Sequence, residues 1–111
     1  MTKDDLIFAG HMLDTARAIV AKVEGVDRAS YDHDDNLRLA LAHLIQTIGE
    51  AAARTSDEFR SSHPEIPWRE IVGMRHKIVH DYIHINFDIV WVVATNRLTL
   101  LIAQLEAIVS D

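Results

Sequence analysis

The sequence predicts an all-α protein, an up-and-down four-helix bundle with a short extra helical turn. Apolar residues recur at spacings of three and four along most of the chain, and no segment shows the clean alternation of a strand. The 4 glycines and 2 prolines lie singly between these apolar periods, without a linker, a repeat or a low-complexity stretch. We therefore interpret residues 1–111 as one domain, large enough to bury a single core.

The first two long helices are predicted from their caps and apolar faces. One begins after Thr2, whose side chain can cap it, and stops at Gly25. The polar segment GVDRASYDHDD is expected to form a loop, and a second helix follows over about residues 35–54. The apolar faces are Leu6, Ala9, Leu13, Ala16, Val20 and Val23 in the first helix, and Leu37, Leu41, Leu44, Ile45, Ile48 and Ala52 in the second.

A short helical turn is expected next, over residues 56–63. A proline-bracketed connection then leads to a third helix that begins near Trp68 and ends at residue 81 or 82. We expect Trp68 to be a core anchor. The last helix is capped by Asn86 and reaches about Val109. It is apolar on two sides, so it lies either at the centre of the bundle or against another subunit.

Composition and charge exclude several classes of protein. With 17 acidic and 11 basic side chains the formal charge is −6, which argues against a broad basic nucleic-acid face but leaves room for a small RNA or nucleotide site. Cysteine is absent, which excludes disulfide frameworks, zinc fingers and thiolate nucleophiles. The N-terminus carries acids where a signal peptide needs positive charge, and no uninterrupted apolar run approaches about 20 residues. We therefore expect no membrane contact and a cytoplasmic location.

The densest polar cluster is GMRHKIVHDYIH, residues 73–84, and three interpretations of it compete. In the first, His76, His80 and His84 share one helix face and bind a metal, although the usual zinc motif HEXXH is absent. In the second, the cluster is a solvated helix end and Arg75 forms only a weak surface ion pair.

In the third interpretation, Arg75 and His80 act on a phosphate. A histidine with a pKa of about 6.5 exchanges protons at neutral pH. An arginine stabilises the charge that grows on a phosphate in the transition state. Together they suffice for metal-independent attack of a ribose 2′-hydroxyl on the adjacent phosphodiester. Because one arginine and one histidine make a sparse site, a second copy from a twofold dimer would help.

At this cluster the sequence resembles the HepT-like toxins of the HEPN superfamily. The family's R-x4-H-x-Y motif is matched by Arg75, His80 and Tyr82, and IGEAA, PEIPW and IVGMR occur in order before it. The resemblance covers about residues 35–95. It implies a HEPN-type bundle, a homodimer whose motifs face a shared cleft, and a metal-independent endoribonuclease without a cofactor, acting on tRNA or mRNA. Arg75 would steady the phosphate and His80 would transfer protons.

The resemblance also implies a regulatory partner, a nucleotidyltransferase antitoxin that transfers AMP from ATP onto Tyr82. The added bulk and negative charge would exclude an RNA phosphate. His76, Asp81 and Glu50 are candidate supporting residues, and Glu50 is expected to be half-buried and to pair with Arg75 across the bundle. The cations on which RNA affinity would depend are Arg60, Arg69, Arg75 and Lys77. The alternative function is that of a non-catalytic partner subunit, which docks on a nucleotidyltransferase and helps to bind nucleotide.

Overall fold

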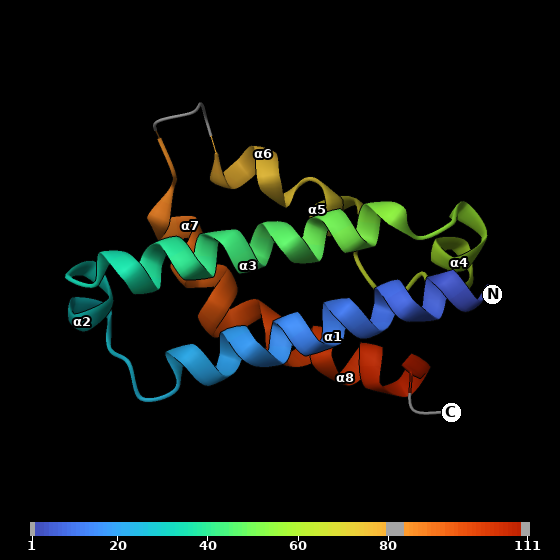
Figure 1. Cartoon of the computed structure of the whole chain (residues 1–111), viewed down its shortest axis with the longest axis horizontal. Helices are drawn as coiled ribbons and strands as arrows, with labels where there is room; N and C mark the ends of the chain where they lie inside the picture. The colour runs from blue at the N-terminus through green and yellow to red at the C-terminus, as the bar shows by residue number, and fades with distance from the viewer. Residues whose placement is uncertain (1, 80–83, 110–111) are drawn as a thin grey trace.

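The computed structural model describes residues 2–79 and 84–109, which fold into an all-α bundle as predicted (Figure 1). Two long helices are α1 (Lys3–Val23) and α3 (Asp35–Arg54). The last long helix consists of α7 (Phe87–Val92), one π-helical turn η1 (Val93–Arg97) and α8 (Leu98–Val109). Four short helices complete the described part of the chain: α2 (Arg28–Asp32), α4 (Asp57–Ser62), α5 (Trp68–Val72) and α6 (Met74–Ile78).

The core lies where α1 packs against both α3 and α8, and α5 and α6 lie along the other side of α3 (Figure 1). Its fully buried members are Ala9, Met12, Ala16 and Ile19 of α1, Tyr31 of α2, Leu41 and Ala52 of α3, Phe59 of α4, Ile78 of α6, Val90 of α7 and Leu105 of α8. Leu6, expected on the buried face of the first helix, is exposed. The buried face of α1 is therefore shifted toward Met12 and Ile19.

A helix, α2, occupies the segment that was expected to be a loop. Asp27 caps it by accepting a hydrogen bond of 2.8 Å from the backbone N–H of Ser30. Tyr31 is fully buried, its hydroxyl donates to the carbonyl of Phe87 at 2.7 Å, and its ring lies 4.7 Å from that of Trp91. A single turn is unstable alone, so this tertiary packing holds α2 in place. The loop prediction is wrong because the formation of α2 depends on contacts with Phe87 and Trp91, which are distant in the sequence.

The predicted third helix is divided in two. α5 ends and α6 begins at Gly73, whose N–H donates to the carbonyl of Arg69 at 3.0 Å. α6 ends at Ile78, because Val79 has the extended backbone of φ −108° and ψ 109°. The helix is therefore shorter than expected, and the remainder of its predicted span, residues 80–82, lies outside the described residues.

The last helix begins as predicted, with the Asn86 side chain accepting a 3.1 Å hydrogen bond from the N–H of Ile89. Its 23 residues, Phe87–Val109, are long and apolar enough to cross a membrane by length and composition, and 33% of their most apolar window is buried. Core helices of soluble proteins pass the same test, so this is weak support for a membrane span. The sequence-based expectation counted only uninterrupted apolar runs, and it stays a prediction.

Asp5 joins two helix starts that are far apart in the sequence. It is 2% exposed, and with Thr2 it forms the capping box of α1. Its carboxylate also accepts hydrogen bonds of 2.8 Å from both the N–H and the hydroxyl of Ser56, the residue that caps α4. The structure shows that it links α1 to α4.

We expect Asp5→Asn to destabilise the protein at neutral pH and to remove part of its acid sensitivity. The backbone hydrogen bond from Ser56 is the largest cause that lowers the pKa of Asp5 from 3.8 to about 2. A lowered folded-state pKa means that this stabilisation is complete above the unfolded pKa and is lost as the pH falls from about 4 to about 2. Thermal unfolding across this pH range is the measurement, with the exposed neighbour in Asp4→Asn as control. Equal unfolding midpoints for the two variants at neutral pH would contradict the assignment.

Candidate active site

The predicted motif lies where the chain passes from α6 to α7. Arg75 is on α6 and its side chain is exposed, as is that of its neighbour His76. His80, Asp81 and Tyr82 lie outside the described residues, so their roles remain predictions.

The segments that leave α6 and enter α7 are held side by side. Val79 and Ile85 form an isolated antiparallel β-bridge, and the N–H of Asn86 donates to the carbonyl of Ile78 at 2.6 Å. These contacts hold together the two ends of the connection that contains most of the motif.

The α7 side of this connection is anchored to α2. Arg28 forms ion pairs with Asp32 at 2.8 Å and with Asp88 near the start of α7. Hydrogen bonds to these two carboxylates raise the pKa of Arg28, and the bond to Asp32 is the larger cause. Burial raises the pKa of Tyr31 to about 12, so its hydroxyl stays neutral and donates to Phe87 at physiological pH. The sequence signal for this anchor was Asp27 as a cap before a buried tyrosine, and it was missed.

Arg75 makes no ion pair with any residue that the structure describes, although most of the other arginines do. The paired ones are Arg17 with Glu106, Arg28 with Asp32 and Asp88, Arg38 with Asp35, and Arg60 with Asp57. Of the cations expected to support RNA affinity, Arg60 is therefore already paired on α4. An exposed guanidinium can bind a phosphate by donating two parallel hydrogen bonds to its oxygens.

Glu50 does not take the predicted role. Its side chain is exposed, and no ion pair joins it to Arg75 within the described chain. The expectation of a half-buried Glu50 is wrong because its preceding neighbour, Gly49, faces the packed side of α3. A Cβ at Gly49 would lie 2.9 Å from the carbonyl oxygen of Ile71, so only glycine permits α5 to pack this closely. Gly49 thus positions the segment that leads to Arg75.

Trp68 is a core residue, as predicted. Its indole N–H donates to the carbonyl of His63 at 2.9 Å, and its ring lies 5.7 Å from that of Phe59. His63 is itself packed against Phe59 at 4.8 Å and lies 3.6 Å from the carboxylate of Glu65. This histidine therefore has a structural environment and lies apart from the motif.

The metal interpretation concerns three histidines, two of which lie in the described part of the chain. Within residues 2–79 and 84–109, no three His, Cys, Asp or Glu side chains are grouped so that they could hold a metal. His76 and His84 are both exposed, and the third proposed ligand, His80, is outside this part of the chain.

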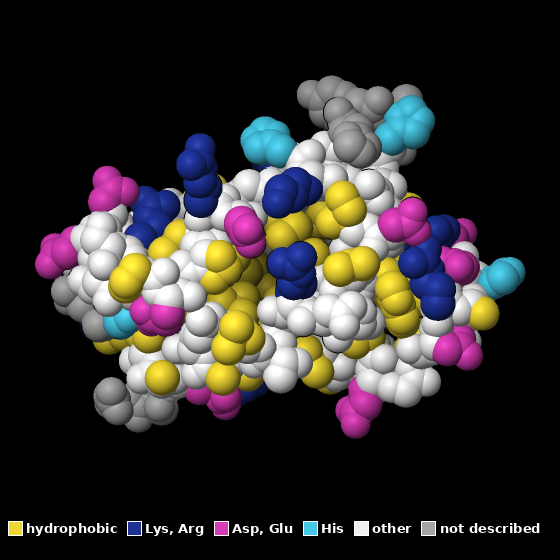
Figure 2. Space-filling model, turned by 180° about the vertical axis from the view of Figure 1, so that it is seen from behind, with side chains coloured by type: hydrophobic (Ala, Val, Ile, Leu, Met, Phe, Trp, Pro, Cys, Tyr) yellow, Lys and Arg dark blue, Asp and Glu magenta, His cyan; other side chains and the backbone are white. Residues whose placement is uncertain are grey.

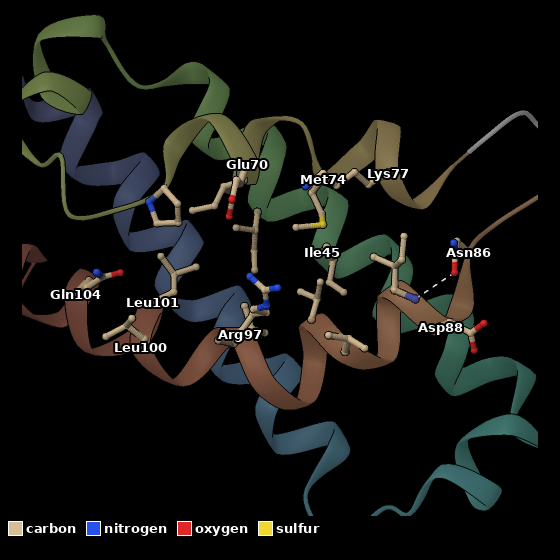
Figure 3. A pocket seen from close by; sticks show the side chains of 17 residues that line it. Ile45, Glu70, Met74, Lys77, Asn86, Asp88, Arg97, Leu100, Leu101 and Gln104 are labelled. Carbon is tan, nitrogen blue, oxygen red and sulfur yellow. Dashed lines mark hydrogen bonds between the residues drawn. The ribbon is translucent and has the colours of Figure 1, made fainter.

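An apolar groove of about 560 Å³ lies between α5–α6 and the last helix, with α3 at its floor (Figure 3). Figure 2 shows hydrophobic side chains gathered in a hollow on this face, with Lys and Arg side chains beside them. Its apolar lining includes Ile45, Ile48, Ile71, Met74, Ile89, Val92, Val93, Leu98, Leu100 and Leu101, and its charged lining is Glu70, Lys77, Asp88 and Arg97. Lys77 lies two residues after Arg75, so the groove borders the candidate site.

Comparison with known proteins places these features in context. The family described as "Ribonuclease HepT-like" matches residues 12–108. The chain is 35% identical over 81 residues to a protein of Caldanaerobacter subterraneus subsp. tengcongensis named "Putative RNase", which covers 73% of this chain and 72% of that protein. It is 36% identical over 58 residues to the "Probable ribonuclease HepT" of Thermococcus cleftensis, covering 52% and 53% of the two chains. A "Putative RNase" of Methanocaldococcus jannaschii is 26% identical over 109 residues, covering 98% and 90%. No solved structure matches the chain significantly.

Proposed function

Because the chain belongs to the HepT-like ribonuclease family, we propose that it is the toxin of a type II toxin–antitoxin pair, a metal-independent endoribonuclease acting in the cytoplasm. The observation that carries the proposal is the placement of Arg75. It lies exposed on α6 without an ion pair to any described residue, and the connection that contains His80 and Tyr82 follows directly. The substrate class is RNA, either tRNA or mRNA.

The chemistry needs only groups of the motif and of the RNA itself. The 2′-oxygen attacks its own phosphate as His80 accepts the 2′-hydroxyl proton, and Arg75 stabilises the charge on the phosphoryl oxygens. The bond between phosphorus and the 5′-oxygen breaks, and that oxygen takes up the proton that the His80 imidazolium gives back, so the histidine returns to its neutral form. The products are a 2′,3′-cyclic phosphate and a free 5′-hydroxyl. A homodimer would bring two such sparse motifs to one cleft.

The test is cleavage of total tRNA by purified protein in EDTA, after mass spectrometry has shown that the protein carries no AMP. Cleavage in EDTA supports a metal-independent nuclease. Loss of cleavage on chelation with recovery on addition of zinc would instead support the metal interpretation of His76, His80 and His84. No cleavage by unmodified protein under any of these conditions would favour the non-catalytic partner subunit.

The proposed regulation is transfer of AMP from ATP to the Tyr82 hydroxyl by a nucleotidyltransferase antitoxin, with release of pyrophosphate. The phosphodiester adds negative charge and bulk two residues from His80, which would repel an RNA phosphate. Support comes from the motif match and from the anchored ends of the connection, Val79–Ile85 and Ile78–Asn86.

We expect co-expression with the antitoxin to add one or more AMP masses to the peptide that contains Tyr82. Tyr82→Phe removes the acceptor oxygen, so the mass gain should disappear. The exposed hydroxyl of Ser61 on α4 gives a control in Ser61→Ala, which should be modified as fully as the wild type. A mass gain that persists in Tyr82→Phe would exclude this acceptor.

A further inference from the structure

We propose that α2 braces the candidate site, and that its residues Arg28 and Tyr31 are positioning residues for RNA cleavage. The inference rests on the proposed function and extends it to two residues outside the motif. α2 is a short helix beside the start of α3 (Figure 1). Its long-range hydrogen bonds reach the first turn of α7, where the connection that contains His80 and Tyr82 rejoins the bundle.

The contacts between α2 and α7 are made at two consecutive residues of α7. The Tyr31 hydroxyl donates a hydrogen bond of 2.7 Å to the carbonyl of Phe87, and the Arg28 guanidinium donates to the carboxylate of Asp88. The same guanidinium donates to Asp32 at 2.8 Å within α2, so it is held by carboxylates of both helices. One bond to the backbone and one to the next side chain together restrict how this turn can shift or rotate.

Helix α3 adds a third contact to the same turn. The guanidinium carbon of Arg38 lies 4.3 Å from the centre of the Phe87 ring, which is the distance of a cation–π contact. Arg38 is itself paired with Asp35 at 2.5 Å. Phe87 is therefore held through its carbonyl by α2 and through its ring by α3.

The brace also reaches the helix that carries Arg75. Asn86 immediately precedes Phe87, and its N–H donates to the carbonyl of Ile78 at 2.6 Å. Ile78 is the last residue of α6, on which Arg75 lies. Because these residues are linked in series, a shift of the first turn of α7 would displace both ends of the connection relative to α6.

The polar groups of the brace can be removed while the core is kept. Of the five residues of α2, all of which the structure describes, Tyr31 is buried and the other four are exposed. The Tyr31 ring packs against that of Trp91 on α7 at 4.7 Å, and phenylalanine would retain this contact. An exposed ion pair such as those of Arg28 contributes little to stability. Loss of the hydroxyl or of the guanidinium should therefore affect the placement of α7 more than the core.

Placement matters because catalysis depends on small distances. Reacting groups must be held within roughly 0.5 Å of their productive positions, and a misplacement of about 1 Å can slow a reaction by about 100-fold. The connection that contains His80 starts at Val79 and returns at Ile85, which form the β-bridge beside the braced turn. Weakening the brace should therefore lower the rate of the chemical step.

Tyr31→Phe and Arg28→Ala test the inference by cleavage of total tRNA in EDTA, with protein that carries no AMP. Each should lower kcat by roughly tenfold and leave the apparent KM for tRNA within about twofold of the wild-type value, because neither residue is placed to contact RNA. Arg28→Lys should recover part of the loss, since an ammonium can still pair with one carboxylate. Arg17→Ala is the matched control, because Arg17 is another exposed arginine that joins distant helices, through Glu106 at 2.6 Å, and it should cleave like the wild type.

Hydrogen exchange of the Asn86 amide measures the brace without any nuclease activity. This N–H is bonded to Ile78, and neither substitution changes the donor or the acceptor. If α2 holds the start of α7, the amide should exchange roughly fivefold faster in Tyr31→Phe and Arg28→Ala than in the wild type. Arg17→Ala should leave the exchange rate unchanged.

The two measurements separate failure of the inference from failure of the proposed function. An active wild type whose kcat is unchanged in both variants would overturn the inference, and so would an unchanged exchange rate of the Asn86 amide. A higher KM at unchanged kcat would make Arg28 a contact with RNA, and an equal loss in Arg17→Ala would indicate general destabilisation; either result contradicts the positioning role. If the wild type does not cleave RNA, the proposed function fails and amide exchange alone decides whether α2 braces α7.

Discussion

Replacing Arg75 or His80 with alanine is expected to slow RNA cleavage by about 10²–10⁴-fold while leaving the fold and the dimer intact. The Arg75 side chain is exposed and makes no ion pair with a described residue, so its removal leaves no buried charge or cavity. The loss should therefore appear in the rate of cleavage and not in the thermal unfolding midpoint. Cleavage of total tRNA in EDTA by proteins shown to carry no AMP measures the effect.

Two matched controls separate the motif from general loss of charge. Arg54→Ala removes an exposed arginine at the end of α3, and His11→Ala removes an exposed histidine from α1. Both should cleave at nearly the wild-type rate. Arg75→Lys should lose most activity, because an ammonium keeps the charge but cannot form the bidentate contact with a phosphate.

The proton-transfer role of His80 also predicts how the rate of RNA cleavage depends on pH. If His80 acts in proton transfer, wild-type cleavage should change with a pKa near the range of histidine, about 6–7. That dependence should vanish from the residual activity of His80→Ala. Full activity in either alanine variant would show that this motif residue has no catalytic role.

Trp68→Ala is expected to lower the free energy of unfolding by about 3–5 kcal/mol, a large part of the total stability of a small domain. Trp68 is buried at the start of α5, packs against Phe59 and donates to the carbonyl of His63. Alanine would leave a cavity at the junction of α4 and α5. Urea unfolding followed by circular dichroism measures the change.

Trp68→Phe separates the contribution of packing to stability from that of the indole hydrogen bond. Phenylalanine retains most of the packing but loses the indole donor, so the carbonyl of His63 loses one partner at a net cost of about 1 kcal/mol. Leu39→Ala, at an exposed position on α3, should change the free energy of unfolding little. If Trp68→Ala cost no more than Leu39→Ala, the core assignment of Trp68 would be contradicted.

Local sequence signals predicted the long helices well. Thr2 and Asn86 cap their helices as predicted, and Ser56 caps the short helix that occupies the turn expected over residues 56–63. Each cap acts within one helical turn, so a short sequence window contains all the atoms involved. The one-turn helix around Tyr31 was missed because it depends on packing against α7. The break at Gly73 was missed as well.

The candidate site was predictable in part. Arg75 was identified from the motif; its side chain is exposed on α6, and its role stays a prediction. Glu50 was assigned a role that its exposure contradicts, and Gly49 beside it was not singled out. Glycine is needed at position 49 because a Cβ there would lie too close to the carbonyl oxygen of Ile71. That oxygen belongs to another helix, so the residues around Gly49 in the sequence do not reveal the contact.

The sequence by itself determined the all-α class, the caps, the apolar faces and the family motif. These features depend on residue spacing and on contacts between residues that are already close in the sequence. Only the tertiary structure decided the rest: the link from Asp5 to Ser56, the anchor of Arg28 on Asp88, and the groove that leaves Leu100 exposed. Each depends on which helix faces lie against one another, and many packings satisfy the same helical periodicity.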